Sequence, residues 1–255
     1  MSKLPKQNQF LDLSDYGRPV ARVIAKSLKG SWVTPVHVTV GFIISGLLAI
    51  VFMLNHQYWI AALFLILKSI LDAADGELAR MNDKPSYIGR YLDSVSDIIL
   101  NFLILITIWH LTKGSMVTAL LAFFAIQLQG TLYNYYCVIL RNKYDGDTTS
   151  RIIENQIPIA MHGESQRSVT ILFKLYTLLY GVFDKIIYNL DKDAAESKYF
   201  PNWFMTAVST FGLGFQLLII SIMLILHLEN YIFLFFIAYS IFILLFIGIR
   251  KIINQ

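Results

Sequence analysis

Residues 72–97 read DAADGELARMNDKPSYIGRYLDSVSD and include two pairs of aspartates at helical spacing, Asp72 with Asp75 and Asp93 with Asp97, in a chain that is otherwise strongly apolar. Residues three or four apart share one face of a helix, so Asp72 lies beside Asp75 and Asp93 lies beside Asp97. Carboxylates that face one another at membrane depth repel unless cations lie between them. The segment therefore predicts two neighbouring helices that present oxygen ligands to hard cations such as Mg²⁺, Mn²⁺ or Ca²⁺.

The composition around this segment is that of an integral membrane protein. Hydrophobic residues make up 56% of the chain and the mean hydropathy is +0.58, whereas an average soluble domain is roughly 45–50% apolar. Six apolar stretches are predicted to be transmembrane helices, at residues 36–54, 58–71, 98–111, 116–140, 203–226 and 231–249. The second and third are short because the aspartate segment completes them, which places the acids near one membrane face. We expect one all-α membrane domain over residues 1–255.

Lysines and arginines predict the orientation of these helices. They gather in the juxtamembrane arm at 1–33, in the turn of the aspartate segment, in the long loop at 141–201 and in the tail. The loops expected on the other side are 55–57, 112–115 and 227–230, and they hold only Lys113. By the positive-inside rule, both termini and the aspartates face the cytoplasm from the cytoplasmic membrane. The net charge of +4 indicates attraction to anionic lipid and not to nucleic acid, because the basic residues flank the spans.

Two segments outside the spans are predicted to form amphipathic helices. In the arm, we expect Ser14 to cap a helix that runs to about Lys29 and lies in the plane of the headgroups. The alternative is a helix that packs on the rest of the protein. Residues 168–190 repeat apolar side chains at helical spacing but also hold charges such as Lys174 and Asp184. They therefore favour an in-plane or docking cytoplasmic helix between the fourth and fifth spans over a seventh span.

The residues beside the aspartates indicate phosphoryl chemistry. A pair of divalent ions between carboxylates can clamp a phosphoryl group during in-line displacement. Arg80 follows Gly76 by four residues and could neutralise a diphosphate oxygen. Gly76, Ala79 and Gly89 are small enough to leave room for a bulky group against the backbone. The pattern favours a diphosphate-linked substrate with an apolar part that enters from the bilayer.

The same residues resemble the motif of the CDP-alcohol phosphotransferases, also called CDP-alcohol phosphatidyltransferases. Every fixed position of that motif is present, in the order Asp72-x2-Asp75-Gly76-x2-Ala79-Arg80-x8-Gly89-x3-Asp93-x3-Asp97. The resemblance extends to a layout of six helices, with the motif across the second and third spans and a juxtamembrane helix before the first. At the start of the first span, the family often shows Pro-Asn-x-x-Thr or Pro-Asn-x-x-Ser. Here Pro35 is followed by Val36, so the asparagine is missing, while Thr39 is retained.

The resemblance implies a role for each residue of the motif. The predicted ligands of two Mg²⁺ or Mn²⁺ ions are Asp72, Asp75, Asp93 and Asp97, with Asp93 bridging. The predicted contacts to the CDP moiety are Gly76, Ala79 and Arg80, with Thr39 and Gly89 on the same side. Asp97 is also the predicted general base that takes the proton from an acceptor hydroxyl.

These roles predict the transfer of a phosphatidyl group from CDP-diacylglycerol, or a similar CDP-lipid, to a small polar alcohol, with release of CMP. The enzyme would thus serve phospholipid biosynthesis. One alternative is transfer from CDP-choline or CDP-ethanolamine to diacylglycerol. Another is a divalent-cation transporter, because carboxylates within a membrane also mark ion paths. The acceptor stays open among glycerol 3-phosphate, inositol phosphate, inositol, serine and other alcohols.

Other polar residues in the spans have two interpretations each. Lys68, one turn before Asp72, could pair with it, contact a phosphate or extend towards the membrane edge. Polar residues of the fourth span could line an acceptor pocket or join helices through hydrogen bonds, and these are Gln127, Gln129 and Asn134. Basic residues that could hold an acceptor phosphate, or serve as ordinary cytoplasmic charges, are Arg90, Arg141, Lys143, Arg151 and Arg167.

Small residues and the lone cysteine complete the sequence-based expectations. Gly41-x3-Ser45 and Gly212-Leu-Gly214 are small-residue faces that permit close helix contact, including contact in a homodimer. Cys137 lies in an apolar run and is expected to be a small buried side chain without a disulfide or metal role.

Overall fold

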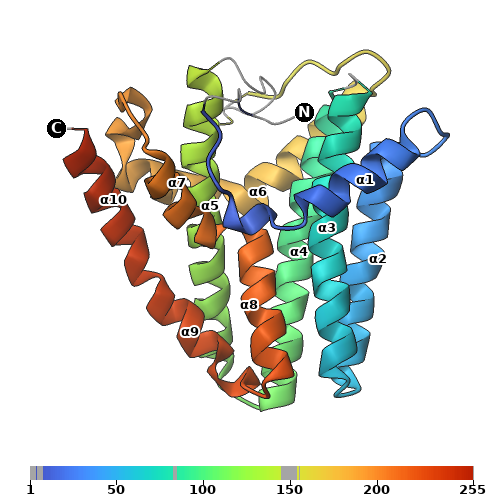
Figure 1. The fold of residues 1–255 in the computed structure, drawn as a ribbon, viewed down its shortest axis with the longest axis vertical. Coiled ribbons are helices and arrows are strands. Elements are labelled where there is room, and N and C mark those ends of the chain that lie inside the picture. Colours follow the sequence, from blue (N-terminus) through green and yellow to red (C-terminus); the bar gives the residue numbers. More distant parts are fainter. Residues whose placement is uncertain (1–3, 5–7, 83–84, 145–153, 155, 255) are drawn as a thin grey trace.

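A computed structural model describes residues 4, 8–82, 85–144, 154 and 156–254 of the chain, and every regular element in these ranges is a helix. The first half forms long helices that run up and down the bundle (Figure 1). These are α2 (Pro35–Leu54), α3 (Tyr58–Met81), α4 (Tyr87–Thr112) and α5 (Met116–Lys143). The motif lies on the last turns of α3 and the first turns of α4, so its residues meet at one end of the bundle. This is the helical placement that the sequence predicted.

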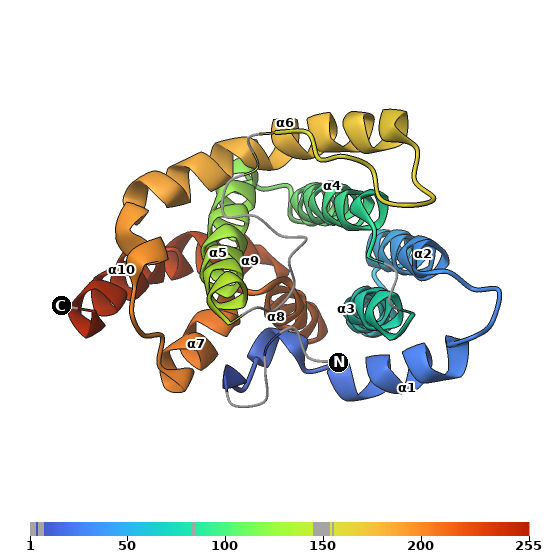
Figure 2. The ribbon, with the colours of Figure 1, turned by 90° about the horizontal axis from the view of Figure 1, so that it is seen from above.

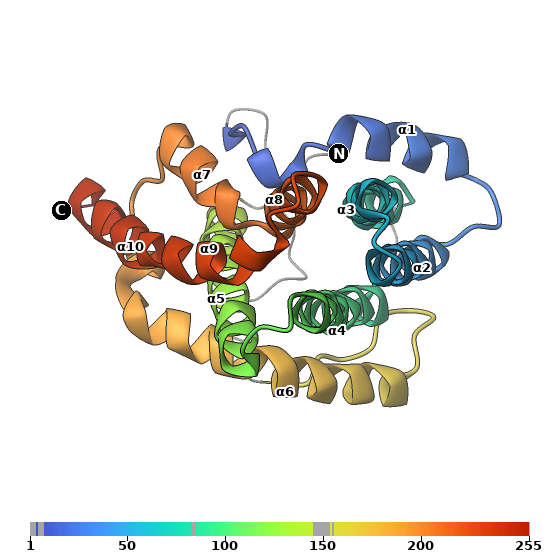
Figure 3. The same ribbon diagram turned by 90° about the horizontal axis from the view of Figure 1, so that it is seen from below.

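The second half returns to the same end through shorter helices (Figure 1). They are α7 (Asn202–Val208), α8 (Leu213–Ile225), α9 (Ile232–Tyr239) and α10 (Ile241–Ile253). Short 3₁₀ turns join them, namely η3 (Lys192–Glu196), η4 (Ser209–Phe211) and η5 (Glu229–Tyr231). Seen from the opposite end of the bundle, α2, α3, α4 and α8 are viewed along their axes, while α9 and α10 slope away to one side (Figure 3).

Four of the described helices are long and apolar enough to span a membrane, and a bent pair of helices could form a fifth span. The sequence predicted six spans. The four are Pro35–Leu54, Tyr87–Thr112, Met116–Lys143 and Glu229–Ile253, and the fifth is the pair α7–η4 with α8, which is bent by 54°. The helix α3 is long enough at 24 residues, but it carries the charged residues Lys68, Asp72 and Asp75. The prediction of an all-helical integral membrane protein is therefore confirmed. The number of six spans stays a prediction.

The helices α1 (Arg18–Leu28) and α6 (Gln166–Leu190) run across the bundle instead of along it (Figures 1 and 2). The predicted cap at Ser14 is wrong, because α1 begins at Arg18, and Asp12 instead caps the short turn η2 (Leu13–Asp15) by accepting from the Ser14 backbone N–H. Ala21 and Ala25 of α1 are buried in the cluster with α3, while several apolar side chains on its other side stay exposed. Small residues thus bring α1 close to α3.

The helix α6 is apolar on two faces. One face packs on the bundle and buries Val169, Phe173, Tyr176, Phe183 and Ile187. The other face exposes Ile171, Leu175, Leu178, Val182 and Ile186, which follow one another at helical spacing. The loop before α6 also secures α4, because the Glu164 carboxylate accepts hydrogen bonds from the Ser86 hydroxyl at 2.7 Å and the Ile88 backbone N–H at 2.8 Å.

The two predicted spans at 203–226 and 231–249 are broken rather than straight. In the first, Gly212 adopts an extended backbone with φ −70° and ψ 151° between η4 and α8. In the second, the helix is interrupted at Ser240 between α9 and α10. There the Gln129 side-chain amide donates to the Phe236 carbonyl at 2.9 Å and to the Ser240 hydroxyl at 3.0 Å. A side chain that inserts into the helical hydrogen-bond ladder is a recognised cause of a kink.

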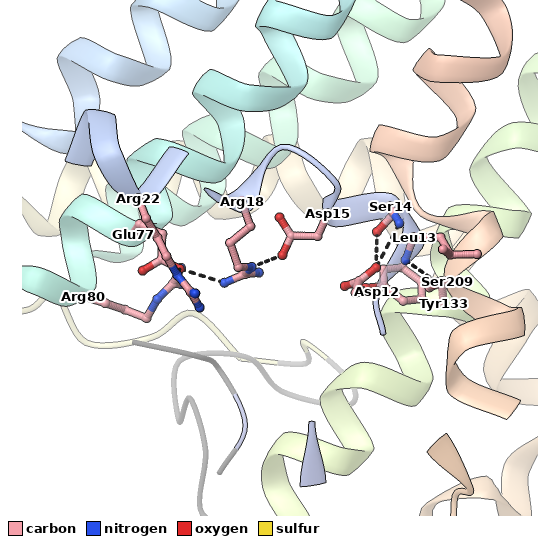
Figure 4. A network of polar contacts seen from close by, with 10 residues as sticks. All are labelled: Asp12, Leu13, Ser14, Asp15, Arg18, Arg22, Glu77, Arg80, Tyr133 and Ser209. Atoms are coloured by element: carbon pink, nitrogen blue, oxygen red, sulfur yellow. Dashed lines mark hydrogen bonds and ion pairs between the residues drawn. The ribbon is translucent and has the colours of Figure 1, made fainter. Parts of the chain in front are cut away.

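The glycines of the first break hold residues 8–17, which we call the amino-terminal strap. A β-carbon built on Gly214 would lie 1.9 Å from the Ser14 carbonyl oxygen, and one on Gly212 would lie 2.3 Å from the Ser14 β-carbon. The strap is also bonded to Ser209, which accepts from the Leu13 backbone N–H at 2.8 Å, and to Tyr133, which donates to Asp12 at 2.5 Å (Figure 4). This small-residue face therefore packs against the chain's own strap.

A buried ion pair secures the carboxyl-terminal helix. The Arg250 guanidinium of α10 donates to both carboxylate oxygens of Asp191, which is fully buried. Tyr136 of α5 donates to the same carboxylate at 2.6 Å. Because a buried charge must be paired and hydrogen-bonded, this triad fixes α10 against α5.

We expect Gly214→Ala to displace the strap and lower the melting temperature, because the added methyl group would overlap Ser14, and overpacking costs about 1–3 kcal/mol. Thermal unfolding of the protein in detergent measures the change, and limited chymotrypsin digestion after Phe10 or Tyr16 reports on the strap. Gly248→Ala is the matched control, since a β-carbon added at Gly248 would meet open space. Equal melting and digestion for the two variants would contradict the strap's tight packing.

Candidate active site

A cavity of about 560 Å³ lies at the end of the bundle that carries the motif. Its walls come from the strap, from α1, α3, α4, α5 and α6, and from the start of α8. Six of the predicted site residues line it, namely Asp72, Asp75, Gly76, Arg80, Asp93 and Asp97. Segments from both ends of the chain thus enclose the aspartates.

Three carboxylates in this cavity can hold a metal ion. Asp72, Asp75 and Asp93 each offer an oxygen, and these oxygens lie within 4.8 Å of one another. Thr39 donates to the Asp75 carboxylate at 2.7 Å and so orients it. The Asp93 Oδ1 atom is buried and has no hydrogen-bond partner among the described residues. Converging oxygens with an unused lone pair fit a hard divalent cation.

Asp97 has a different partner. It lies outside the three-carboxylate group of the described residues, and its Oδ1 accepts from the Lys68 ammonium at 2.6 Å. Lys68 is completely buried, and its ammonium lies 5.0 Å from the centre of the Phe42 ring. Of the roles considered for Lys68, the structure therefore favours an ion pair, but with Asp97 on α4 instead of Asp72 on its own helix.

Three arginines surround one buried carboxylate at the edge of the cavity (Figure 4). Glu77 is fully buried, and its Oε1 lies 2.8 Å from the Arg18 guanidinium, 3.4 Å from Arg22 and 3.6 Å from Arg80. Arg18 also pairs with Asp15 of the strap. Three guanidinium groups against two carboxylates leave a net positive charge, which suits a bound diphosphate.

Sequence reasoning missed Arg18, Arg22 and Glu77 as site residues. The sequence indicated Arg18 and Arg22 only as charged residues on the polar side of an amphipathic helix. Glu77 lies two residues after Asp75, so it points away from the aspartate face of α3 and towards α1. The position of Glu77 among the motif acids could have marked it as a site residue. Its partners Arg18 and Arg22 could not be identified in this way, because they lie 59 and 55 residues earlier in the chain.

The remaining predicted nucleotide residues lie outside the cavity lining. Thr39 contacts Asp75, as described above, and Ala79 lies on α3 between Gly76 and the end of the helix. The Gly89 backbone N–H donates to the Ser86 hydroxyl at 2.8 Å and so belongs to the first turn of α4. Gly76 does line the cavity, and a β-carbon there would lie 3.3 Å from the Arg80 guanidinium.

The polar residues of α5 divide between the two roles considered for them. Gln127 and Asn134 line the cavity, together with Thr131. Gln129 instead joins helices, through the hydrogen bonds at the break between α9 and α10. Cys137 is buried, as expected. The face that includes Gln127, Thr131 and Asn134 thus turns towards the site.

Two of the basic residues considered for an acceptor phosphate, Arg90 and Lys143, are engaged elsewhere. Arg141 lines the cavity. Arg90 pairs with a glutamate of the long loop, and Lys143 donates to a backbone carbonyl at 3.2 Å. Arg167 is exposed, and Arg151 lies outside the described residues. Their predicted role as ordinary charges is favoured for Arg90, Lys143 and Arg167.

The helix α6 supplies a wall that the sequence indicated only as an apolar stripe. Tyr176, Tyr180 and Asp184 line the cavity. Tyr180 donates to the Ser94 carbonyl at 3.1 Å, and Tyr176 donates to the Asp184 carboxylate at 3.3 Å. Burial raises the pKa of Asp184 to about 6, although the Tyr176 hydroxyl partly offsets this effect.

The fold and the site define a helical membrane protein in which carboxylates and arginines converge on one cavity. Residues 32–186 match the family model for CDP-alcohol phosphatidyltransferase. This match covers more than half of the chain, so the chain belongs to the CDP-alcohol phosphatidyltransferase family, which is a family of enzymes.

Two curated relatives are similar to shorter stretches. An archaetidylinositol phosphate synthase of Pyrococcus horikoshii is 40% identical over 81 residues, which are 31% of this chain and 42% of that protein. A CDP-diacylglycerol–serine O-phosphatidyltransferase of Bacillus subtilis is 42% identical over 65 residues, which are 26% of this chain and 37% of that protein. The similar stretches thus span less than half the length of either relative.

We expect Lys68→Met to destabilise the protein, because it leaves the largely buried Asp97 carboxylate without its partner, and breaking a buried pair costs about 3–5 kcal/mol. The double variant Lys68→Met/Asp97→Asn removes both charges and should recover most of the lost stability. Thermal unfolding of the wild type, both single variants and the double variant measures this coupling. Simply additive losses would contradict the ion pair.

We expect Asp184→Asn to stabilise the protein more at pH 7.5 than at pH 5. The folded pKa of about 6 lies above the ordinary value of 3.8, so the folded state favours the protonated acid. The favourable contribution of the Asp184 carboxyl group to the free energy of unfolding is fully present below pH 3.8 and is lost as the pH rises through 6. Melting temperatures at both pH values measure the difference, with the exposed residue Asp193 changed to Asn as the control. An equal shift at both pH values would contradict the burial of this carboxyl group.

Proposed function

We propose that this protein transfers a phosphatidyl group from CDP-diacylglycerol, or a similar CDP-linked lipid, to a small polar alcohol and releases CMP. The reaction would be a step of phospholipid biosynthesis. The observation that carries the proposal is the group of Asp72, Asp75 and Asp93 carboxylates, in one cavity with Arg80. Family membership supports it, and one relative is named for CDP-diacylglycerol and serine.

The three carboxylates would hold the metal, as one or two Mg²⁺ or Mn²⁺ ions, with Asp97 as a further ligand or as the base. When bound, the ions would neutralise the donor diphosphate and the charge of the departing CMP. Thr39 keeps Asp75 turned towards the group through its hydrogen bond. The requirement for a hard cation follows from the oxygen-only donor set.

The protein's own groups would perform the remaining steps. Arg80, with Arg18 and Arg22 beside it, would bind the diphosphate at the cationic edge of the cavity. Asp97 would accept the proton of the acceptor hydroxyl, while Lys68 holds its carboxylate in place. The acceptor oxygen would then form a bond to the β-phosphorus as the bond to CMP breaks.

We propose six spans for the membrane topology, with α3 as the second and the broken helices α7–α8 and α9–α10 as the last two. The outer apolar stripe of α6 and the exposed side chains Val20 and Val23 of α1 support an in-plane position for both transverse helices. The positive-inside rule would place both termini and the site on the cytoplasmic side of the cytoplasmic membrane. The homodimer stays a prediction. Gly212 and Gly214 pack against the strap, and Ser45 donates to the Phe64 carbonyl at 2.7 Å within the chain.

The test is a transfer assay with the purified protein in nanodiscs. With CDP-diacylglycerol, Mg²⁺ and a mixture of candidate alcohols, we expect release of CMP and a new lipid, identified by mass spectrometry. Asp93→Asn should reduce CMP release by about a hundredfold or more, because the site loses a charge that the ions require. Chelation by EDTA should have the same effect, and the exposed control Asp193→Asn should not.

Three results would contradict the proposal. Full activity of Asp93→Asn would remove the carboxylate group from the mechanism. Consumption of CDP-choline with diacylglycerol, but not of CDP-diacylglycerol, would favour the second enzyme activity. Divalent-cation flux through liposomes without CMP release would favour a transporter.

A further inference from the structure

The inner end of the cavity is a polar floor that the proposed metal and nucleotide groups do not use. It includes Asn101 of α4, Gln127 and Thr131 of α5 and Gln216 of α8. We call the end of the cavity with the arginines its mouth. Asn101 lies one helical turn after Asp97 on α4, and so further from this mouth. The floor therefore continues from the proposed base towards the centre of the bundle.

Thr131 and Gln127 lie at the depths of Asp97 and Asn101. Thr131 is as many residues from the start of α5 as Asp97 is from the end of α4, and the same holds for Gln127 and Asn101. The two helices are antiparallel and joined by a short turn (Figure 1). Because each residue adds the same rise, equal offsets correspond to similar depths.

Two side chains of this floor have polar atoms without a partner. The Gln127 amide nitrogen and the Thr131 hydroxyl are buried and make no hydrogen bond to any described residue, and only 4% and 7% of the two residues is exposed. The neighbouring Gln216 is satisfied, because it donates to the Ile126 carbonyl at 3.1 Å and to Gln129 at 3.3 Å. Buried polar atoms are nearly always paired, so the unpaired ones indicate a bound polar ligand.

The charged residues of the cavity lining lie outside the floor. The cations of its lining, Arg18, Arg22, Arg80 and Arg141, lie on α1 or in the last turns of α3 and α5. The floor residues are uncharged, and Lys68 is engaged by Asp97. The Asp184 carboxylate of α6 adds negative charge to the wall. A phosphate on the floor would thus be buried without a cation, which is costly.

We propose that Gln127 and Thr131 form the acceptor subsite, which binds a small alcohol that carries no phosphate and directs its hydroxyl towards Asp97. This inference rests on the proposed function and narrows its acceptor class to amino alcohols and polyols. The unpaired amide and hydroxyl bind the acceptor's polar groups, and the lack of a cation excludes its phosphorylated form. Selection by unmet hydrogen bonds is strong when the site is buried.

The experiment compares acceptors and variants at saturating CDP-diacylglycerol and Mg²⁺. Serine, inositol and glycerol are supplied in one set, and glycerol 3-phosphate and inositol phosphate in the other. We expect CMP release with a member of the first set only. Which member is used separates an amino alcohol from a polyol.

Thr131→Val and Gln127→Leu should each raise the KM for that acceptor about five- to tenfold and leave the KM for CDP-diacylglycerol unchanged. Thr107→Val is the matched control. It removes a buried hydroxyl of α4 that bonds to the Leu103 carbonyl at 2.8 Å and does not line the cavity. The control shows whether the loss of a buried threonine hydroxyl by itself changes KM.

Three outcomes would overturn the inference. Use of a phosphorylated acceptor alone would reverse the acceptor class and leave the proposed transferase function intact. Unchanged acceptor KM in both variants would remove Gln127 and Thr131 from the subsite, again without affecting the proposed function. Failure of the wild type to release CMP with every acceptor would contradict the proposed function itself, and the inference with it.

Discussion

The main physical constraint on this structure is the repulsion between the aspartate carboxylates of α3 and α4, which face one another inside an apolar bundle. Buried charges of one sign are stable only if protein groups or ions compensate them. Thr39 compensates Asp75 and Lys68 compensates Asp97, but the Asp93 oxygen has no described partner. The protein therefore neutralises part of this charge and leaves the remainder for cations. The carboxylates that α3 and α4 bring together could hold a metal ion.

The cavity around these carboxylates has two ends of different character. At the mouth, α1 lies against α3 through small residues, so that Arg18 and Arg22 reach Glu77 beside Arg80. At the floor, α4, α5 and α8 contribute uncharged side chains that include Asn101, Gln127 and Gln216. A diphosphate suits the first environment and a neutral alcohol suits the second. The carboxylates lie between them, where a phosphoryl group would pass from one to the other.

Breaks in the later helices make this enclosure possible. The segment 202–225 is bent by 54° at Gly212, beside the strap. Gly212 and Gly214 leave space for Ser14, and the Gln129 amide holds the interrupted turn between α9 and α10. The strap in turn brings Asp15 and Arg18 to the cavity. The loss of helical continuity in the second half of the chain thus completes a site that the first half begins.

The sequence by itself determined the all-helical membrane character, the placement of the motif across two helices and the position of Asp72 and Asp75 on one helix face. These features follow from local rules, namely apolar run length and the spacing of residues on a helix face. Only the tertiary structure decided that Lys68 pairs with Asp97, that Arg18 and Arg22 share Glu77, and that Ser14 occupies the glycine face. Each of these contacts joins residues far apart in the chain, and single-helix periodicity carries no information about which helix lies opposite. The same reason explains why Gln127 and Gln129, two residues apart on α5, serve a cavity and a helix kink respectively.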